Sequence, residues 1–151
     1  MKRYAFRLEA VLKLRKLKEE NCRMELGRLI ADLQLFEEQL SHERNQIQNY
    51  YGIQENSLKT GIRGNQIQAF PMLVAAKEKN IQLLLRDKKQ QQHLIEEKTR
   101  ELAVLRGELK VIENLKEKDF SEWKKAYNKD MDQKIEEQTQ NWLNYNRVND
   151  K

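Results

Sequence analysis

Residues 26–40 read LGRLIADLQLFEEQL. The large apolar residues of this stretch alternate by three and four positions: Leu26, Leu29, Leu33, Phe36 and Leu40. That spacing places them on one narrow stripe of an α-helix, as in a coiled coil. The same spacing runs from residue 8 to residue 54, and ten of its fourteen positions carry an apolar residue or Cys. Because 38% of the whole chain is hydrophobic, this enrichment predicts a seam for one or two partner helices.

A second run with the same spacing follows a break in the chain. From Phe70 to Lys116, nine of the fourteen seam positions are apolar, and after a slip of one residue an apolar stripe continues from Phe120 to Tyr145. Between the two runs, residues 59–71 contain two Gly and the only Pro. Gly can end a helix in the left-handed conformation, and Pro suits the first turn of the next helix. We therefore expect helices over about residues 6–58 and 70–146, with a loop over about 59–69.

The fold class predicted is all-α: a long antiparallel two-helix coiled-coil hairpin, in one domain over residues 1–151, with the second helix extending past the first. Folding about the break pairs Tyr50 with about Val74. It also leaves the stretch after about Lys124 without a partner. Two aromatic groups result, one at each end of the hairpin: Tyr4, Phe6, Phe120, Trp123 and Tyr127 at the open end, and Tyr50, Tyr51 and Phe70 at the closed end.

The seam also contains polar residues, among them Arg15, Glu19, Glu43, Lys77, Lys88, Gln91, Lys98 and Lys116. In a narrow seam, Lys and Arg can bury their stems and keep their charge in water. Polar seam residues can also fix the register, at a cost in stability. We expect the hairpin to be only modestly stable by itself.

The net charge of +5 is local, because basic residues gather near the N-terminus. A basic helix end can meet nucleic acid, anionic lipid or an acidic protein groove, or can simply be a solvated face. The single cysteine, Cys22, lies on the seam and is expected to pack as a small hydrophobe. No apolar run has the ~20 residues of a membrane span, and no secretory signal is visible. We expect a cytoplasmic protein without direct membrane insertion.

The sequence offers no catalytic constellation, so we expect no enzyme, no metal and no cofactor. His42 and His93 are the only histidines, on different predicted helices and without the i, i+4 partner of a zinc-binding helix. Gly61 and Gly64 are not followed by the Gly-Lys-Ser/Thr of a phosphate-binding loop. Paired glutamates are abundant, but a coiled coil has no pocket that could shift their pKa values.

Three stretches resemble the FliJ family: residues 6–15 (FRLEAVLKLR), residues 111–118 (VIENLKEK) and the charged, Gln-rich residues 131–138 (MDQKIEEQ). The resemblance implies a cytoplasmic component of the bacterial flagellar type III export apparatus, held at the inner membrane through its partners. It also implies a monomeric hairpin similar to the central stalk of rotary ATPases. Such a hairpin would insert its open end into the hexameric export ATPase, and would bind the membrane-embedded export gate and export chaperones.

The resemblance and the hairpin geometry together give two sets of candidate docking residues. Those for the ATPase are Arg3, Arg7, Arg15, Trp123, Tyr127, Met131, Trp142 and Tyr145. Those for the export gate are Gln39, Tyr50, Tyr51, Phe70, Val74 and Ile81.

Two alternatives stay open from the residues alone. One is a structural coiled coil that associates with itself. The other is a basic rod that binds nucleic acid, which the lack of aromatics interleaved with a basic patch disfavours. The residues also do not separate a flagellar from an injection-type secretion system.

Overall fold

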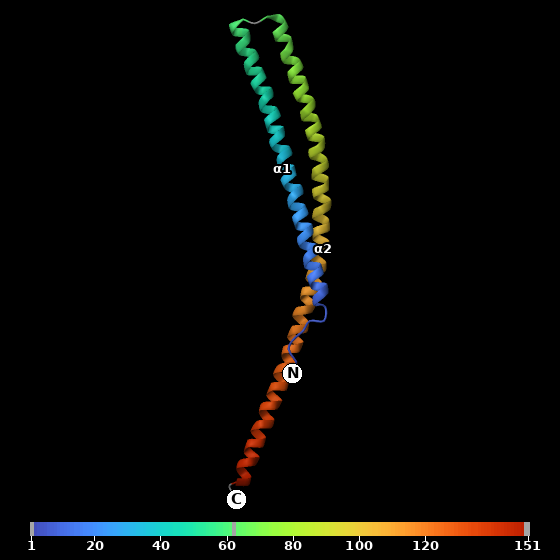
Figure 1. The fold of residues 1–151 in the computed structure, drawn as a ribbon, viewed down its shortest axis with the longest axis vertical. Helices are drawn as coiled ribbons and strands as arrows, with labels where there is room; N and C mark the ends of the chain where they lie inside the picture. The colour runs from blue at the N-terminus through green and yellow to red at the C-terminus, as the bar shows by residue number, and fades with distance from the viewer. Residues whose placement is uncertain (1, 62, 150–151) are drawn as a thin grey trace. The chain divides into compact units, whose positions relative to one another are not determined.

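A computed structural model describes residues 2–61 and 63–149, which form two α-helices. Helix α1 spans Glu9–Thr60 with 52 residues, and helix α2 spans Gly64–Asn149 with 86 residues (Figure 1). The described residues contain no strand. The predicted all-α hairpin with unequal helices is therefore confirmed.

By its internal contacts the chain divides into two compact units. Unit 1 comprises residues 1–19 and 104–151, and unit 2 comprises residues 20–103. Each unit contains a piece of α1 and a piece of α2. Whether the chain behaves as the single domain expected from its sequence stays a prediction.

In unit 2 the two helices run antiparallel and side by side (Figure 1). Glu43 pairs with Lys77, and the amide of Gln91 donates to the carbonyl oxygen of Leu29 at 3.0 Å. Residues earlier in α1 thus contact residues later in α2, as an antiparallel pair of helices requires. Among the described residues of this unit, the buried hydrophobic side chains all lie on the predicted seam: Cys22, Leu40, Val74 and Leu102.

In unit 1 the same antiparallel arrangement continues. The guanidinium of Arg15 donates to the carbonyl oxygen of Glu108 at 2.7 Å, and the ammonium of Lys116 lies 2.9 Å from the carboxylate of Glu9. Leu12 and Ile112 are the buried hydrophobic residues here, with 2% and 5% of their surface exposed. The core is one residue layer thick, as a two-helix seam requires.

The predicted seam is confirmed along its length. All fourteen positions from Leu8 to Gln54, and all fourteen from Phe70 to Lys116, are buried or half-buried. Eight of the polar seam residues pair across the helices, which limits the cost of placing them there. Their partners are Glu108 for Arg15, Arg106 for Glu19, Lys77 for Glu43, Glu37 for Lys88, Leu29 for Gln91, Glu25 for Lys98 and Glu9 for Lys116.

Helix α1 ends as its sequence indicates. Gly61 has φ of +85°, the left-handed conformation that only Gly adopts without strain. The hydroxyl of Thr60 donates to the carbonyl oxygen of Asn56 at 3.1 Å, which satisfies one acceptor of the last turn. The connection is shorter than the expected loop over 59–69, since α2 begins at Gly64. Ile62, within that loop, lies outside the described residues.

The early start of α2 has two visible causes. The amide nitrogens of Gln66 and Ile67 both donate to the carbonyl oxygen of Arg63, at 3.0 and 3.3 Å, which closes a first turn. Ile67 is half-buried and continues the seam three residues before Phe70. Pro71 therefore lies inside α2 and not in its first turn. It has no N–H to donate to the carbonyl of residue 67, a cost that the packing of this turn has to offset.

Candidate docking surfaces

An aromatic cluster closes unit 1 next to the start of the chain. The ring of Tyr4 lies 5.0 Å from Phe120 in an edge-to-face contact and 5.5 Å from Trp123. Trp123 stacks on Phe120 at 5.8 Å and on Tyr127 at 5.2 Å. Such pairs contribute about 0.5–1.5 kcal/mol each beyond their buried area. The cluster expected at the open end is thus present and fastens residues before α1 onto α2.

Hydrogen bonds hold Tyr4 in that position. Its phenol donates to the carbonyl oxygen of Lys116 at 3.3 Å and to the carboxylate of Asp119 at 3.2 Å. Burial first, and then the hydrogen bond and negative charge of Asp119, raise the pKa of Tyr4 above its usual 10.0. The ammonium of Lys116 lies 6.0 Å from the ring centre of Phe6, which joins the remaining predicted aromatic to this end.

Beyond Tyr127, helix α2 continues without cover. From Met131 to Asn149 every residue except Asn146 is exposed. The apolar stripe is still present: Met131 is 39% exposed, Ile135 55%, Trp142 63% and Tyr145 67%. We call the segment Met131–Asn149 the overhang. Large apolar side chains at helical spacing on an uncovered helix are typical of a binding surface.

Local contacts support the helix of the overhang. Lys134 pairs with Asp130 one turn earlier at 3.1 Å, and the hydroxyl of Thr139 donates to the carbonyl oxygen of Ile135 at 2.8 Å. The hydrogen bond to Asp130 and its charge raise the pKa of Lys134. Pairs of this kind stabilise an exposed helix by a few tenths of a kcal/mol.

The basic candidates for ATPase docking differ in their availability. Arg3 and Arg7 are exposed. Arg15 is half-buried, with its guanidinium bound to the backbone of α2. Arg15 therefore serves the register of the hairpin, and only Arg3 and Arg7 offer a free positive charge.

The candidates for gate docking lie in unit 2 and fall into two groups. Tyr51 is 53% exposed, and Gln39 is exposed as well. The other four lie on the seam: Tyr50, Phe70 and Ile81 are half-buried, and Val74 is 7% exposed. Val74 belongs to the core, so it positions the helices and offers little surface to a partner.

A groove beside Gln39 was not foreseen from the sequence. It is lined by Gln39, Glu43, Asn80, Leu83, Leu84 and Asp87. Leu83 is 52% exposed there. Glu43 and Lys77, both on the seam, form an ion pair at 3.2 Å. In the sequence, this groove could have been found from Leu83, an apolar residue one position before the seam residue Leu84.

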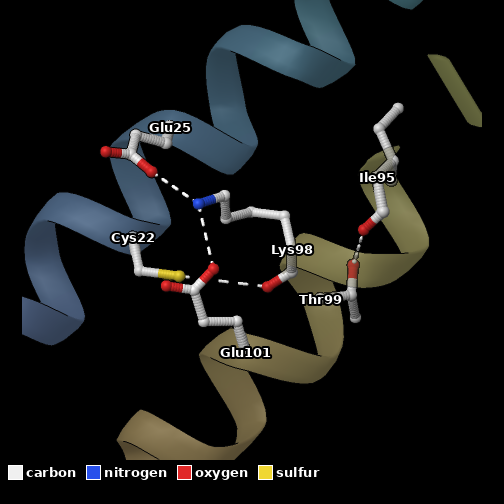
Figure 2. A network of polar contacts seen from close by, with 6 residues as sticks. All are labelled: Cys22, Glu25, Ile95, Lys98, Thr99 and Glu101. Carbon is white, nitrogen blue, oxygen red and sulfur yellow. Dashed lines mark hydrogen bonds and ion pairs between the residues drawn. The ribbon is translucent and has the colours of Figure 1, made fainter. Parts of the chain in front are cut away.

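A polar network of unit 2 surrounds Lys98 (Figure 2). Its ammonium lies 2.6 Å from the carboxylate of Glu25 on α1 and 3.0 Å from that of Glu101 on α2. The Cys22 thiol, only 3% exposed, points to the Lys98 carbonyl oxygen at 3.9 Å. The hydrogen bond from Lys98 lowers the pKa of Glu25, and Glu25 and Glu101 raise the pKa of Lys98. These contacts join the helices in one register.

The described residues form neither a metal cluster nor a membrane-spanning stretch. Among residues 2–61 and 63–149, no group of three or more His, Cys, Asp or Glu side chains is placed to hold a metal ion. Neither described helix contains a stretch apolar and long enough to cross a membrane.

The fold defines the class: an antiparallel coiled-coil hairpin whose second helix carries an uncovered apolar stripe. Within this class, the model of the family described as flagellar FliJ protein matches residues 4–138. The chain therefore belongs to the FliJ family, whose members are components of the flagellar export apparatus. No curated protein and no solved structure matches the chain. Trp142 and Tyr145 lie beyond the matched residues, so their role has to be argued from the structure.

Proposed function

We propose that this chain is a non-catalytic, stalk-like activator of the flagellar export ATPase, located in the cytoplasm at the inner membrane through its partners. The observation that carries the proposal is the overhang. Helix α2 continues for more than twenty residues past the aromatic cluster and keeps its apolar stripe exposed. Burying such a stripe in a partner would contribute roughly 25 cal/mol per Å² before the costs of association.

The overhang is suited to a concave partner. Trp142 and Tyr145 are three residues apart and so lie on one face of α2, with Ile135 two turns before Trp142. Large aromatic side chains are the usual anchors of a protein interface. Arg3 and Arg7 belong to unit 1, as the overhang does. Their exposed positive charges would meet acidic residues at the rim of the ATPase ring.

The test is steady-state ATP hydrolysis by the export ATPase of the same organism, with this protein added. We expect a saturable rise in rate with the native chain. Trp142→Ala combined with Tyr145→Ala should remove most of that rise. Leu83→Ala combined with Leu94→Ala is the control, since it removes two side chains 52% and 47% exposed in unit 2. Equal activation by the two double variants would reject the overhang as the docking surface.

We further propose that unit 2 contacts the export gate, through Tyr51, Gln39 and the groove beside Gln39. Tyr50, Phe70 and Ile81 would add the exposed parts of their side chains, and Val74 would hold the two helices in place. Binding of export chaperones to this protein is part of the same proposal. Tyr51→Ala should weaken binding to the cytoplasmic part of the gate protein, measured by calorimetry, while Met72→Ala should not. Retention of full affinity in Tyr51→Ala would argue against this assignment.

The alternative is a coiled coil that associates with itself, and exposed leucines such as Leu14, Leu17 and Leu35 are the observation that favours it. Light scattering distinguishes the two. A monomer mass of 18.2 kDa at micromolar concentration agrees with the stalk proposal, and twice that mass favours self-association.

A further inference from the structure

We propose that the outer face of the first three turns of α1, with the residues just before them, binds the surface of an anionic membrane directly. The face consists of Leu14 and Leu17, flanked by the cations Lys13 and Lys18, with Lys2, Arg3 and Arg7 ahead of them in the chain. The exposed Lys16 lies nearby, on the side of Leu12. This contact goes beyond the proposed attachment to the membrane through protein partners.

The positive charge of the protein is concentrated in this segment. Residues 2–19 hold seven of the 29 Lys and Arg of the chain but only two of its 24 Asp and Glu. The entire net charge of +5 therefore comes from these residues, and the rest of the chain is balanced. A local excess of this size attracts an anionic surface over about a Debye length.

The structure turns the two carboxylates away from this face. Glu19 is 8% exposed and pairs with Arg106 at 3.3 Å, while Glu9 pairs with Lys116 at 2.9 Å. The hydrogen bond from Lys116 lowers the pKa of Glu9, so that carboxylate stays charged and paired. Six cations remain exposed on the outside: Lys2, Arg3, Arg7, Lys13, Lys16 and Lys18.

Exposed apolar side chains lie between the cations. Leu14 is 52% exposed and Leu17 is 53% exposed, although neither belongs to the seam. At 3.6 residues per turn, they share one side of α1, opposite the buried Leu12 and Glu19. Lys13 flanks this pair on one side and Lys18 flanks it on the other, while Arg7 lies in the turn before α1. An apolar strip bordered by Lys and Arg is the arrangement of a helix that lies in the membrane interface.

Charge and chemistry favour a membrane over the other occupants. A second copy of this chain would bring six cations against six cations in a two-fold contact, which is repulsive. Nucleic acid would use the cations but would gain nothing from the two leucines. The aromatic residues of this segment, Tyr4 and Phe6, are half-buried and not free to stack on bases. Anionic phospholipid satisfies both the cations and the leucines.

The test uses the full chain and sedimentation with vesicles of phosphatidylcholine containing roughly 30% phosphatidylglycerol, against vesicles of phosphatidylcholine alone. We expect binding to the anionic vesicles only, weakening as salt is raised. The combination Lys13→Gln, Lys16→Gln and Lys18→Gln should lower the partition coefficient roughly a hundredfold. Lys110→Gln, Lys118→Gln and Lys125→Gln remove the same charge from exposed positions of α2 and should have a much smaller effect.

A second pair of measurements separates lipid from other polyanions. Leu14→Gln with Leu17→Gln should weaken vesicle binding several-fold while circular dichroism stays unchanged, because both side chains are exposed. Three results would overturn the proposal. The first is no binding of the native chain to anionic vesicles, and the second is an equal loss of vesicle binding in the two triple lysine variants. The third is a double leucine variant that keeps its full vesicle binding and binds double-stranded DNA just as tightly. Of the residues of this face and the segment before it, only Arg3 and Arg7 are assigned to ATPase docking, and both stay native in the variants. Loss of vesicle binding with normal ATPase activation would therefore leave the proposed function standing.

Discussion

Replacing Leu40 by Ala tests whether the narrow seam holds the hairpin together. Leu40 is 3% exposed, so nearly its whole side chain leaves water on folding. Burying a Leu contributes about 1.5–3 kcal/mol, and deleting it in a core costs about 2–5 kcal/mol because a cavity remains. Here only two helices surround the site, and they can close onto it. We therefore expect a loss near the lower end, about 2–3 kcal/mol.

Leu35→Ala is the matched control for this prediction. Leu35 lies on the same helix, five residues away, but is 55% exposed. Its replacement should change the free energy of unfolding by less than about 0.5 kcal/mol. Urea unfolding followed by circular dichroism measures both variants. With a slope of about 1–3 kcal/mol per molar urea, Leu40→Ala should lower the midpoint by about 1–2 M. Equal midpoints for the two variants would refute the assignment of the seam as the core.

Three further predictions follow from the same contacts. Leu33→Asp should unfold much of the hairpin because it places a charge on the seam, whereas Tyr51→Ala should leave the helical signal unchanged; equal loss of ellipticity in both would contradict the division between seam and surface. The hydrogen bond from Lys98 lowers the pKa of Glu25 below its usual 4.5. The ion pair of Glu25 therefore contributes its full stabilisation above about pH 4.5, and this contribution is lost as the pH falls through the lowered pKa of Glu25. Glu25→Gln should therefore flatten the fall in urea midpoint between about pH 5 and pH 3, and an unchanged slope would show that the pair does not couple to folding. Tyr4→Phe removes the hydroxyl that contacts Lys116 and Asp119 but keeps the ring, so it should lower stability, and Tyr4→Ala should lower it more; equal losses would mean that the ring contacts contribute nothing.

Much of this fold could be predicted from its sequence because one pattern determines it. The alternation of three and four marks the side chains that face the partner helix, and the structure buries those positions from Leu8 to Lys116. The beginning of α2 was harder to predict, since Gly64 and Pro71 are poor helix residues locally. Packing of Ile67 on the seam overrides that preference, and it is a tertiary effect that local propensity does not contain.

The candidate docking residues could be predicted less well. Sequence spacing identified the stripe from Trp123 to Tyr145, and the structure leaves its second half uncovered. It did not show that the guanidinium of Arg15 binds the backbone of α2. It placed Val74 both on the seam and among the docking residues, and the structure buries it. The same residue type can be buried between the two helices or exposed to a partner. Which of the two occurs depends on the exact register of the helices. The FliJ family membership places the chain in the export apparatus but assigns no contact to a residue.

The central claim is that this protein acts as the stalk of the export ATPase, and a titration of ATP hydrolysis tests it most directly. A closed ring has a single axis, so a stalk on that axis should saturate the rise in rate at about one chain for six ATPase subunits. Trp142→Ala with Tyr145→Ala should abolish the rise at the same concentrations. No rise with the native chain, or saturation at about one chain for each subunit, would contradict the stalk account and leave a coiled coil that serves the export apparatus in another way.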